Sequence, residues 1–260
     1  MTDVLLSAFL LSVVLLGIHS FFGLEIIKRG IIFTDLAIGQ MAAMGAAISL
    51  LFLDGGYLDL ISLAFALLGG AVIAFASRRA TSHEAFIGRL YAFGLAAVFI
   101  ILSKSYHGME TFQKLMASDI LFTPLSEIAV TAVIYAVLGA ILLVFYPKAS
   151  GLAKEAIFFV TFAVTVTIAV RLAGVLIVFA LLVSPALMAL KIRRGKALIN
   201  AWIIGTVVNL VAIIISYNYD LPTGYTLVAL HALLALVVSL IVPPPGEATS
   251  TQAARSGPTP

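Results

Sequence analysis

The feature that most constrains the fold is a succession of long apolar stretches that leave little of the chain for anything else. A transmembrane helix needs about 20 mostly apolar residues. Nine stretches approach this length, at residues 4–27, 31–53, 59–77, 86–103, 125–146, 156–170, 173–190, 198–217 and 222–242. Of the 260 residues, 62% are hydrophobic and only 10% are charged, whereas about 25% are charged in soluble domains. The sequence therefore predicts an all-α, polytopic helical membrane protein.

The boundary between the sixth and seventh stretches is the least sharply marked. Residues 156–190 are too long for one crossing, and Arg171 and Gly174 interrupt them. We expect two helices with a tight turn there, which gives about nine spans, with eight as the alternative. Because the connections are short, residues 1–243 are predicted to form one transmembrane domain. Residues 244–260, rich in Pro, Gly, Ser and Thr, are predicted to be a disordered tail.

The distribution of Lys and Arg predicts the orientation of the spans, since these residues concentrate in cytoplasmic connections. With nine spans and the N-terminus outside, 12 of the 15 Lys and Arg residues fall inside, and only Lys104, Lys114 and Arg171 fall outside. The C-terminus and the tail are then cytoplasmic. This bias explains the pI of about 9.2 without a nucleic-acid partner.

A few polar side chains interrupt the apolar stretches, where they are costly unless they face a bundle interior or a hydrated path. The set comprises His19, Asp35, Gln40, Asn209 and His231. At about 1.5 Å per residue, His19, Gln40 and His231 lie near the middle of the membrane, and Asp35 lies about one turn from its inner boundary. Asp35 is the strongest candidate for a direct role in transport.

Each of these residues also has an interpretation without transport. A buried histidine such as His231 or His19 is more often a hydrogen-bonded packing residue than a metal ligand, and Asn209 is expected to join two helices. Gln40 is five residues from Asp35, so a straight helix does not direct both side chains at one ion. With no cysteine in the chain, a metal ion must be held by imidazole, carboxylate, amide or backbone oxygen.

Charged groups at the ends of the apolar stretches favour structural roles. Glu25 is expected to pair with Lys28 and Arg29 at the membrane interface. Ser82 is expected to cap the helix that begins after it. The sequence contains no G-x-x-x-x-G-K-[ST] loop, H-E-x-x-H or G-x-S-x-G motif. We therefore expect no enzyme activity, including nucleotide hydrolysis, from this chain itself.

Four stretches are distinctive when taken together in order: EAFIGRLYAFGLAAVFIILS (84–103), MASDILFTPLSEI (116–128), RLAGVLIVFALLVSPALMA (171–189) and YDLPTGYTLVALHALLALVVSL (219–240). In this register they resemble the permease subunits of zinc/manganese/iron ABC importers. The resemblance implies a half-transporter of the inner (plasma) membrane for a divalent metal ion, zinc first and manganese or iron next. It also implies a cytoplasmic ATP-binding subunit, an extracytoplasmic metal-binding protein and a second permease copy as partners, with no permanently bound cofactor.

One departure from the family pattern concerns the metal site. Typical members carry D-A-x-x-H after the first inside loop, whereas Asp35 is followed here by Gly39 at the His position and then by Gln40. Imidazole suits zinc, and an uncharged amide is a poor ligand. The chain resembles a less common branch with F-x-D-L-A-x-x-Q and a His in the first span. The transport path is thus predicted to include Asp35, with Gln40, His231 and His19 as further candidates.

A second departure concerns the segment that meets the ATPase. Typical members have a long inside stretch of the form S-F-D-P-E-x-A-R-A-x-G, and only YPKASGLAKEA (146–156) remains here. This shorter segment is expected to engage the ATPase through Lys148, Gly151, Lys154 and Glu155, and an altered coupling surface is the alternative.

Two other functions stay open. The missing histidine favours an ABC permease whose cargo is a metal chelate or a small organic solute. Alternatively, Asp35 and the membrane histidines suit a proton relay in a stand-alone proton-coupled carrier or channel.

Overall fold

The computed structural model describes residues 2–76, 82–104, 110, 120–192 and 195–241, and within these ranges the regular structure is entirely helical. The elements are α1 (Thr2–Arg29), α2 (Thr34–Leu53), α3 (Leu58–Ala76), α4 (His83–Leu102), the 3-10 turn η1 (Ile120–Phe122), α6 (Leu125–Val144), α7 (Gly151–Ala173), α8 (Val175–Lys191), α9 (Ala197–Tyr219) and α10 (Thr223–Ile241). Eight of these helices are long and apolar enough to cross a membrane, and α8 is shorter, at 17 residues. The prediction of an all-α polytopic membrane protein is confirmed. The predicted tail, residues 244–260, lies outside the described residues.

The break between α7 and α8 is where the sequence placed it. Gly174 has φ 82° and ψ 156°, a backbone region that is essentially restricted to glycine. Its N–H still donates to the Val170 carbonyl at 2.9 Å, which closes the last turn of α7. At its other end α7 begins at Gly151 and not at residue 156, so the predicted start was wrong. The helix extends beyond the apolar stretch into polar residues, and a search for apolar stretches does not include these.

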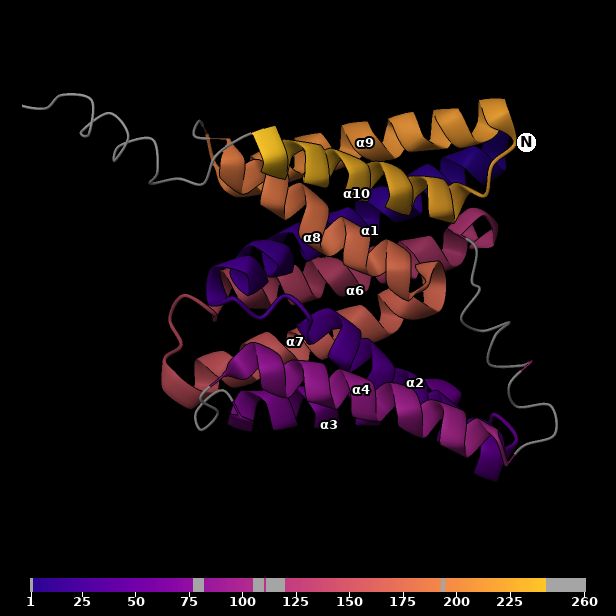
Figure 1. Cartoon of the computed structure of the whole chain (residues 1–260), viewed down its shortest axis with the longest axis vertical. Coiled ribbons are helices and arrows are strands. Elements are labelled where there is room, and N and C mark those ends of the chain that lie inside the picture. Colours follow the sequence, from indigo (N-terminus) through magenta and orange to yellow (C-terminus); the bar gives the residue numbers. More distant parts are fainter. Residues whose placement is uncertain (1, 77–81, 105–109, 111–119, 193–194, 242–260) are drawn as a thin grey trace, which may run out of the picture.

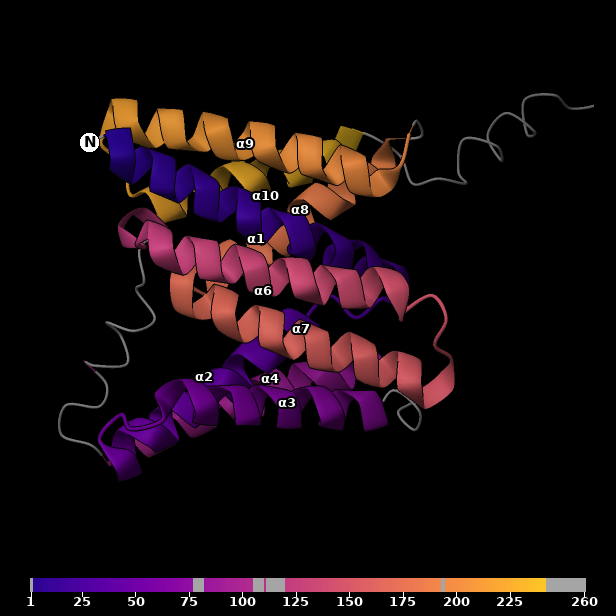
Figure 2. The same ribbon diagram turned by 180° about the vertical axis from the view of Figure 1, so that it is seen from behind.

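The helices form two groups with a layer between them. In Figure 1, α1, α8, α9 and α10 lie on one side of the bundle and α2, α3 and α4 on the other, with α6 and α7 between them. Figure 2 shows the same order from behind. The most extensive contacts join α2 to α3 and α4 in one group, and α1 to α8 in the other. The middle layer is attached to both, because α6 packs on α1 and α7 packs on α3.

The two ends of the bundle are named here by the predicted orientation. The inner end contains the end of α1 and the start of α7. The outer end contains the connection between α2 and α3 and the break between α7 and α8. The orientation itself stays a prediction.

Close helix contacts in both groups depend on glycine. A side chain on Gly23 of α1 would overlap the Leu182 carbonyl of α8, and one on Gly45 of α2 would lie 2.7 Å from the Ile61 carbonyl of α3. Such approaches suit a membrane bundle, because lipid supplies no hydrophobic drive between helices and packing must supply the attraction.

Candidate functional site

Asp35 is an acidic residue buried in the first turn of α2. Its exposed fraction is 0%, and neither carboxylate oxygen has a hydrogen-bond partner within the described residues. Its neighbour Thr34 is satisfied locally, because its hydroxyl donates to the Ile31 carbonyl at 2.6 Å. A buried carboxylate without a partner is costly. Packing therefore does not explain why α2 contains Asp35.

The start of α2 is held by a side chain from another helix. The backbone N–H of Phe33 donates to Oε1 of Glu84, the second residue of α4, at 3.1 Å. Ser82 occupies the N-cap position of α4 but makes no side-chain capping bond, so the predicted cap is absent. Glu84 therefore fixes the start of α2, close in the sequence to Asp35.

His19 of α1 is a second fully buried titratable residue. Its Nδ1–H donates to the Leu15 carbonyl at 2.7 Å. Because a carbonyl only accepts, Nδ1 carries a proton, and in the neutral ring Nε2 then carries the lone pair. Nε2 has no partner within the described part of the chain. In its neutral form the imidazole thus has a free nitrogen that can coordinate a metal ion.

Tyr135 of α6 lies beside His19. The ring centroids of these two residues are 6.1 Å apart. The Tyr135 hydroxyl donates to the Thr165 carbonyl of α7 at 2.8 Å. Sequence reasoning missed Tyr135. The available signal was a tyrosine inside an apolar stretch, where a buried hydroxyl requires a partner.

His231 is engaged through one ring nitrogen, and its Nδ1 has no partner within the described residues. Its Nε2–H donates to Asn209 Oδ1 at 2.8 Å and so joins α10 to α9. Both residues are fully buried. The prediction that Asn209 joins two helices is confirmed, and the hydrogen bond of His231 agrees with its packing interpretation. A role for His231 in the transport path stays a prediction.

Gln40 and Gly39 face different neighbours. A Cβ added at Gly94 of α4 would lie 3.0 Å from the Gln40 Cβ, whereas one added at Gly39 would lie 3.2 Å from Val175 Cγ2, at the break between α7 and α8. The position of the family's histidine therefore faces the bundle interior, and Gln40 packs against α4. Within the described ranges no group of three or more His, Asp or Glu residues is placed to hold a metal ion.

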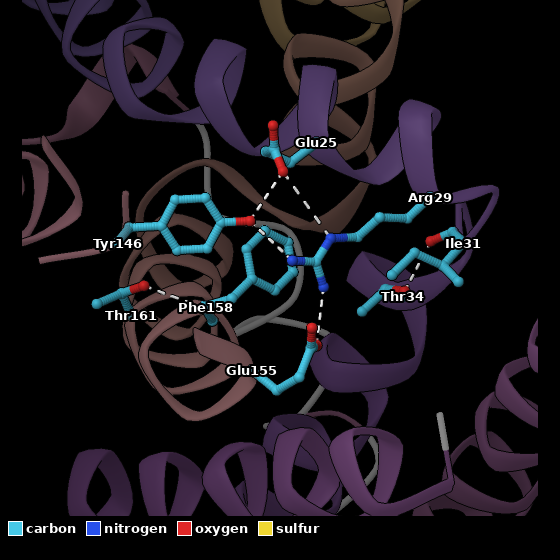
Figure 3. Close-up of polar contacts among 8 residues, drawn as sticks. All are labelled: Glu25, Arg29, Ile31, Thr34, Tyr146, Glu155, Phe158 and Thr161. Atoms are coloured by element: carbon cyan, nitrogen blue, oxygen red, sulfur yellow. Dashed lines mark hydrogen bonds and ion pairs between the residues drawn. The ribbon is translucent and has the colours of Figure 1, made fainter. Parts of the chain in front are cut away.

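The inner end of the bundle contains a network that joins α1 to the start of α7 (Figure 3). Arg29 donates to Glu155 Oε2 at 2.8 Å and to the Tyr146 hydroxyl at 2.7 Å, and Tyr146 donates to Glu25 Oε2 at 2.8 Å. The guanidinium carbon of Arg29 lies 4.2 Å from the centroid of the Phe158 ring. Burial, followed by the hydrogen bond to Glu25, raises the pKa of Tyr146 to about 12. We call Glu25, Arg29, Tyr146 and Glu155 the inner network.

Glu25 also forms the ion pairs predicted from the sequence. Its carboxylate lies 3.5 Å from Lys28 Nζ and 3.9 Å from Arg29 Nε. The predicted ion pairs are confirmed, whereas spacing within α1 does not indicate the longer network through Tyr146.

The four predicted coupling residues lie in different surroundings. Lys148 and Gly151 are exposed, and Gly151 begins α7 with φ 55°. Lys154 and Glu155 are half-buried and line a cavity of about 460 Å³ at the inner end, where Glu155 is bound by Arg29. Contact of these residues with an ATPase stays a prediction.

Part of the chain matches a known protein family. Residues 149–242 match the model of the ABC 3 transport family. The family resemblance predicted from the sequence is confirmed over this stretch. No curated protein matches the chain.

Solved structures share the fold over most of the chain. PsaBC from Streptococcus pneumoniae, in complex with Fab, has a TM-score of 0.72 and 18% identity over 91% of this chain and 91% of that chain. A protein assigned to the metal-chelate type of ABC transporter, in an inward-facing conformation, has a TM-score of 0.67 and 15% identity over 90% of this chain and 84% of that chain. The chain thus has the fold of these two proteins, and its eight long apolar helices within the described residues are those of a multi-pass membrane protein.

Proposed function

We propose that this chain is the membrane-spanning permease subunit of an ABC importer for a divalent transition-metal ion. The observation that carries this proposal is the match of residues 149–242 to the ABC 3 transport family. The fold shared with PsaBC supports it across the remainder of the chain. Since the sequence has no phosphate-binding loop, a separate ATP-binding subunit supplies the energy.

The buried polar residues support a metal ion as the cargo, with zinc as the first candidate and manganese or iron next. Within the part of the chain that the structure describes, neither the carboxylate oxygens of Asp35 nor Nε2 of His19 have a partner, so these atoms can bind an ion. Imidazole suits zinc, and carboxylate suits manganese as well. In this proposal His19 supplies from α1 the imidazole that Gly39 does not supply from α2.

The small number of protein ligands favours a site that binds the metal ion only transiently, with further ligands from outside this chain. Zinc takes about four ligands, and Asp35 and His19 provide one carboxylate and one imidazole. Water or a second permease copy completes the coordination in this account. An incomplete ligand set favours release as well as binding, which a transport site needs. An extracytoplasmic metal-binding protein is proposed to deliver the ion.

A metal chelate is the second candidate cargo. Within the described residues no group of three metal-binding side chains is found, and one structural neighbour is assigned to the metal-chelate type. A chelated metal brings its own ligands, so a chelate-carrying passage needs fewer protein donors.

The test uses the assembled transporter, with its ATPase and binding protein, in proteoliposomes. Zn²⁺, Mn²⁺ and Fe²⁺ are added separately, free and as chelates, and ATP hydrolysis and metal uptake are measured. We expect ATP-dependent uptake of a free ion, with Zn²⁺ most effective. Stimulation by chelates alone supports the second cargo. Metal uptake by the chain without the ATPase contradicts the proposed function and supports a stand-alone carrier.

A further inference from the structure

A groove runs along the face of α1 that lies between α6 and α9. In Figure 2, α1 passes between these two helices. Helix α1 packs on both of them, whereas α6 and α9 have no extensive contact with each other within the described residues. The groove has a volume of about 340 Å³, and its lining comes from these three helices alone. We call it the α6–α9 groove.

The lining of the α6–α9 groove offers no free polar side chain. Only Tyr135 and Trp202 among its residues carry polar side-chain atoms. The Tyr135 hydroxyl donates to the Thr165 carbonyl at 2.8 Å, and the Trp202 indole N–H donates to the Gly17 carbonyl at 2.9 Å. The remaining lining is aliphatic side chains, one phenyl ring and glycine. A polar solute would lose its hydrogen bonds to water here without replacement, so the lining favours a hydrocarbon chain.

The α6–α9 groove has the depth of one leaflet of the bilayer. Its lining residues on α6 extend from Ala132 to Leu143, the residue before the last of the helix. Eleven positions correspond to about 16 Å, and one leaflet contributes about half of a hydrocarbon core of about 30 Å. Leu198, the second residue of α9, also lines the groove. The groove thus extends from the inner end of the bundle to about the middle of the membrane.

One lysine stands at the inner end of each wall. Lys148 follows the last residue of α6 by four positions, and Lys196 directly precedes α9. Both are exposed, and neither ammonium group has an ion-pair partner within the described residues. Basic side chains at the cytoplasmic surface attract anionic lipids. An apolar groove with free cations at its inner mouth therefore matches a lipid that has a negative headgroup.

We propose that the α6–α9 groove binds an acyl chain of an anionic phospholipid from the cytoplasmic leaflet, whose phosphate is held by Lys148 and Lys196. The bound chain fills the space between two helices that lack extensive contact with each other. It also packs against Tyr135, whose ring centroid is 6.1 Å from that of His19. The lipid thus supports the position of α6 beside α1.

Charge favours a lipid over a second permease copy in this groove. The two copies of a two-fold dimer present the same surface to each other, and in one membrane they share their orientation. A dimer formed through the α6–α9 groove would therefore bring Lys148 and Lys196 of both copies to the same level of the membrane. Like charges brought together at an interface oppose association, whereas an anionic headgroup compensates them.

Trp202 reports on the occupant, because it is the only tryptophan of the chain and is 41% exposed where it lines the groove. A brominated acyl chain quenches tryptophan fluorescence on contact. The full chain is reconstituted in mixtures of phosphatidylglycerol, which is anionic, and phosphatidylcholine, which is zwitterionic, with bromine on one of the two lipids. Fluorescence is compared with that of the same protein in lipid without bromine. The dependence on mole fraction gives the preference for the anionic lipid at Trp202.

We expect a preference for phosphatidylglycerol of about 5-fold for each lysine. Lys148→Gln and Lys196→Gln should each lower it by about this factor. Lys104→Gln is the matched control, because Lys104 is exposed just beyond α4, at the predicted outer end, and should leave the preference unchanged. In detergent without phospholipid the two groove lysines have no ligand, so their substitution should not affect stability. Equal quenching by both lipids, or an equal effect of Lys104→Gln, overturns the proposal.

Filling the groove provides a test that does not depend on charge. A Cβ added at Gly139, in the wall formed by α6, meets nothing within 4 Å, so Gly139→Leu should fold and place its side chain where the acyl chain binds. The preference for phosphatidylglycerol at Trp202 should then disappear. Gly88→Leu in α4 is the control, because a Cβ there also meets nothing within 4 Å, and it should retain the preference.

Two further results would overturn the proposal. If Gly139→Leu retains the full preference, the anionic lipid lies outside the groove. If neither brominated lipid quenches Trp202 in the unmodified chain, protein covers the groove, as in a dimer formed through this face. None of these measurements involves metal uptake, so the lipid site and the proposed function stand or fall separately.

Discussion

Arg29, the last residue of α1, donates a hydrogen bond of 2.8 Å to Glu155, the fifth residue of α7, although 126 positions separate the two in the sequence. The pair joins one of the two helix groups to the middle layer of the bundle. His19 lies ten residues before Arg29 on the same helix, about 15 Å along α1. The segment predicted to meet the ATPase is thereby connected to the helix that carries the free imidazole.

Glu155→Gln should weaken this connection without changing the shape of the side chain. A charge-assisted hydrogen bond becomes a neutral one, so we expect the free energy of unfolding to fall by about 1 kcal/mol. The melting temperature of the purified chain in detergent measures the effect. Lys148→Gln is the control, because Lys148 is exposed and a surface change is worth about 0.5 kcal/mol or less. Equal shifts for the two variants contradict the structural role of the pair.

The pKa of Tyr146 predicts an alkaline loss of stability. The pKa of Tyr146 is about 12 in the folded chain, compared with 10.0 for a tyrosine that is exposed and has no partners. A raised pKa means that the folded state retains the proton more strongly. The contribution of this hydroxyl is therefore complete below pH 10 and is lost as the pH rises to 12. The melting temperature of the unmodified chain should fall more steeply across this range than that of Tyr146→Phe. If the melting temperatures of the two proteins change in parallel with pH, Tyr146 contributes nothing to the alkaline loss of stability.

Gly174→Ala should destabilise the break between α7 and α8. Its φ of 82° and ψ of 156° are accessible almost only to glycine, and the strain costs about 1–3 kcal/mol. Gly88→Ala in α4 is the matched control, because an added Cβ there meets nothing within 4 Å. In a helix that change should stabilise by about 0.4–1 kcal/mol. Thermal unfolding of both variants should therefore show shifts of opposite sign, and a neutral Gly174→Ala contradicts the account of the break.

Substitution of His19 should affect metal binding, whereas substitution of His231 should affect stability. His19→Asn should lower the apparent Zn²⁺ affinity measured by ATPase stimulation about 10- to 100-fold, the range found when even the supporting residues of a metal site are changed. His231→Ala removes the hydrogen bond to Asn209, which should cost about 0.6–1.7 kcal/mol of stability and leave the Zn²⁺ dependence unchanged. The reverse pattern would assign the transport role to His231.

The sequence predicts the spans well because membrane thickness sets the length of an apolar helix. Arg171 and Gly174 predict a break in the sequence, and in the structure α7 ends and α8 begins at this position. The start of α7 is not predictable in this way, because Gly151 to Glu155 form a helix outside the apolar stretch. Hydropathy reports burial in lipid and carries no information on polar helical turns beyond it.

The candidate site is only partly readable from the sequence. The burial of Asp35 and the pairing of Asn209 across helices follow from the cost of polar groups in hydrocarbon. The partners of Tyr135 and Tyr146 lie 30 and 121 positions away. Such contacts depend on which helices pack together, and periodicity along one helix does not specify that.

The central claim is that the Asp35 carboxylate lies on the route of the transported cation, and Asp35→Asn tests it most directly. ATP-dependent Zn²⁺ uptake by the assembled transporter in proteoliposomes is compared with that of Asp54→Asn, and the melting temperatures of both variants are recorded. We predict that Asp35→Asn abolishes uptake without lowering the melting temperature, because the carboxylate has no hydrogen-bond partner to lose among the described residues. Asp54→Asn should transport like the unmodified chain. Unchanged uptake by Asp35→Asn, together with higher thermal stability, would contradict the account.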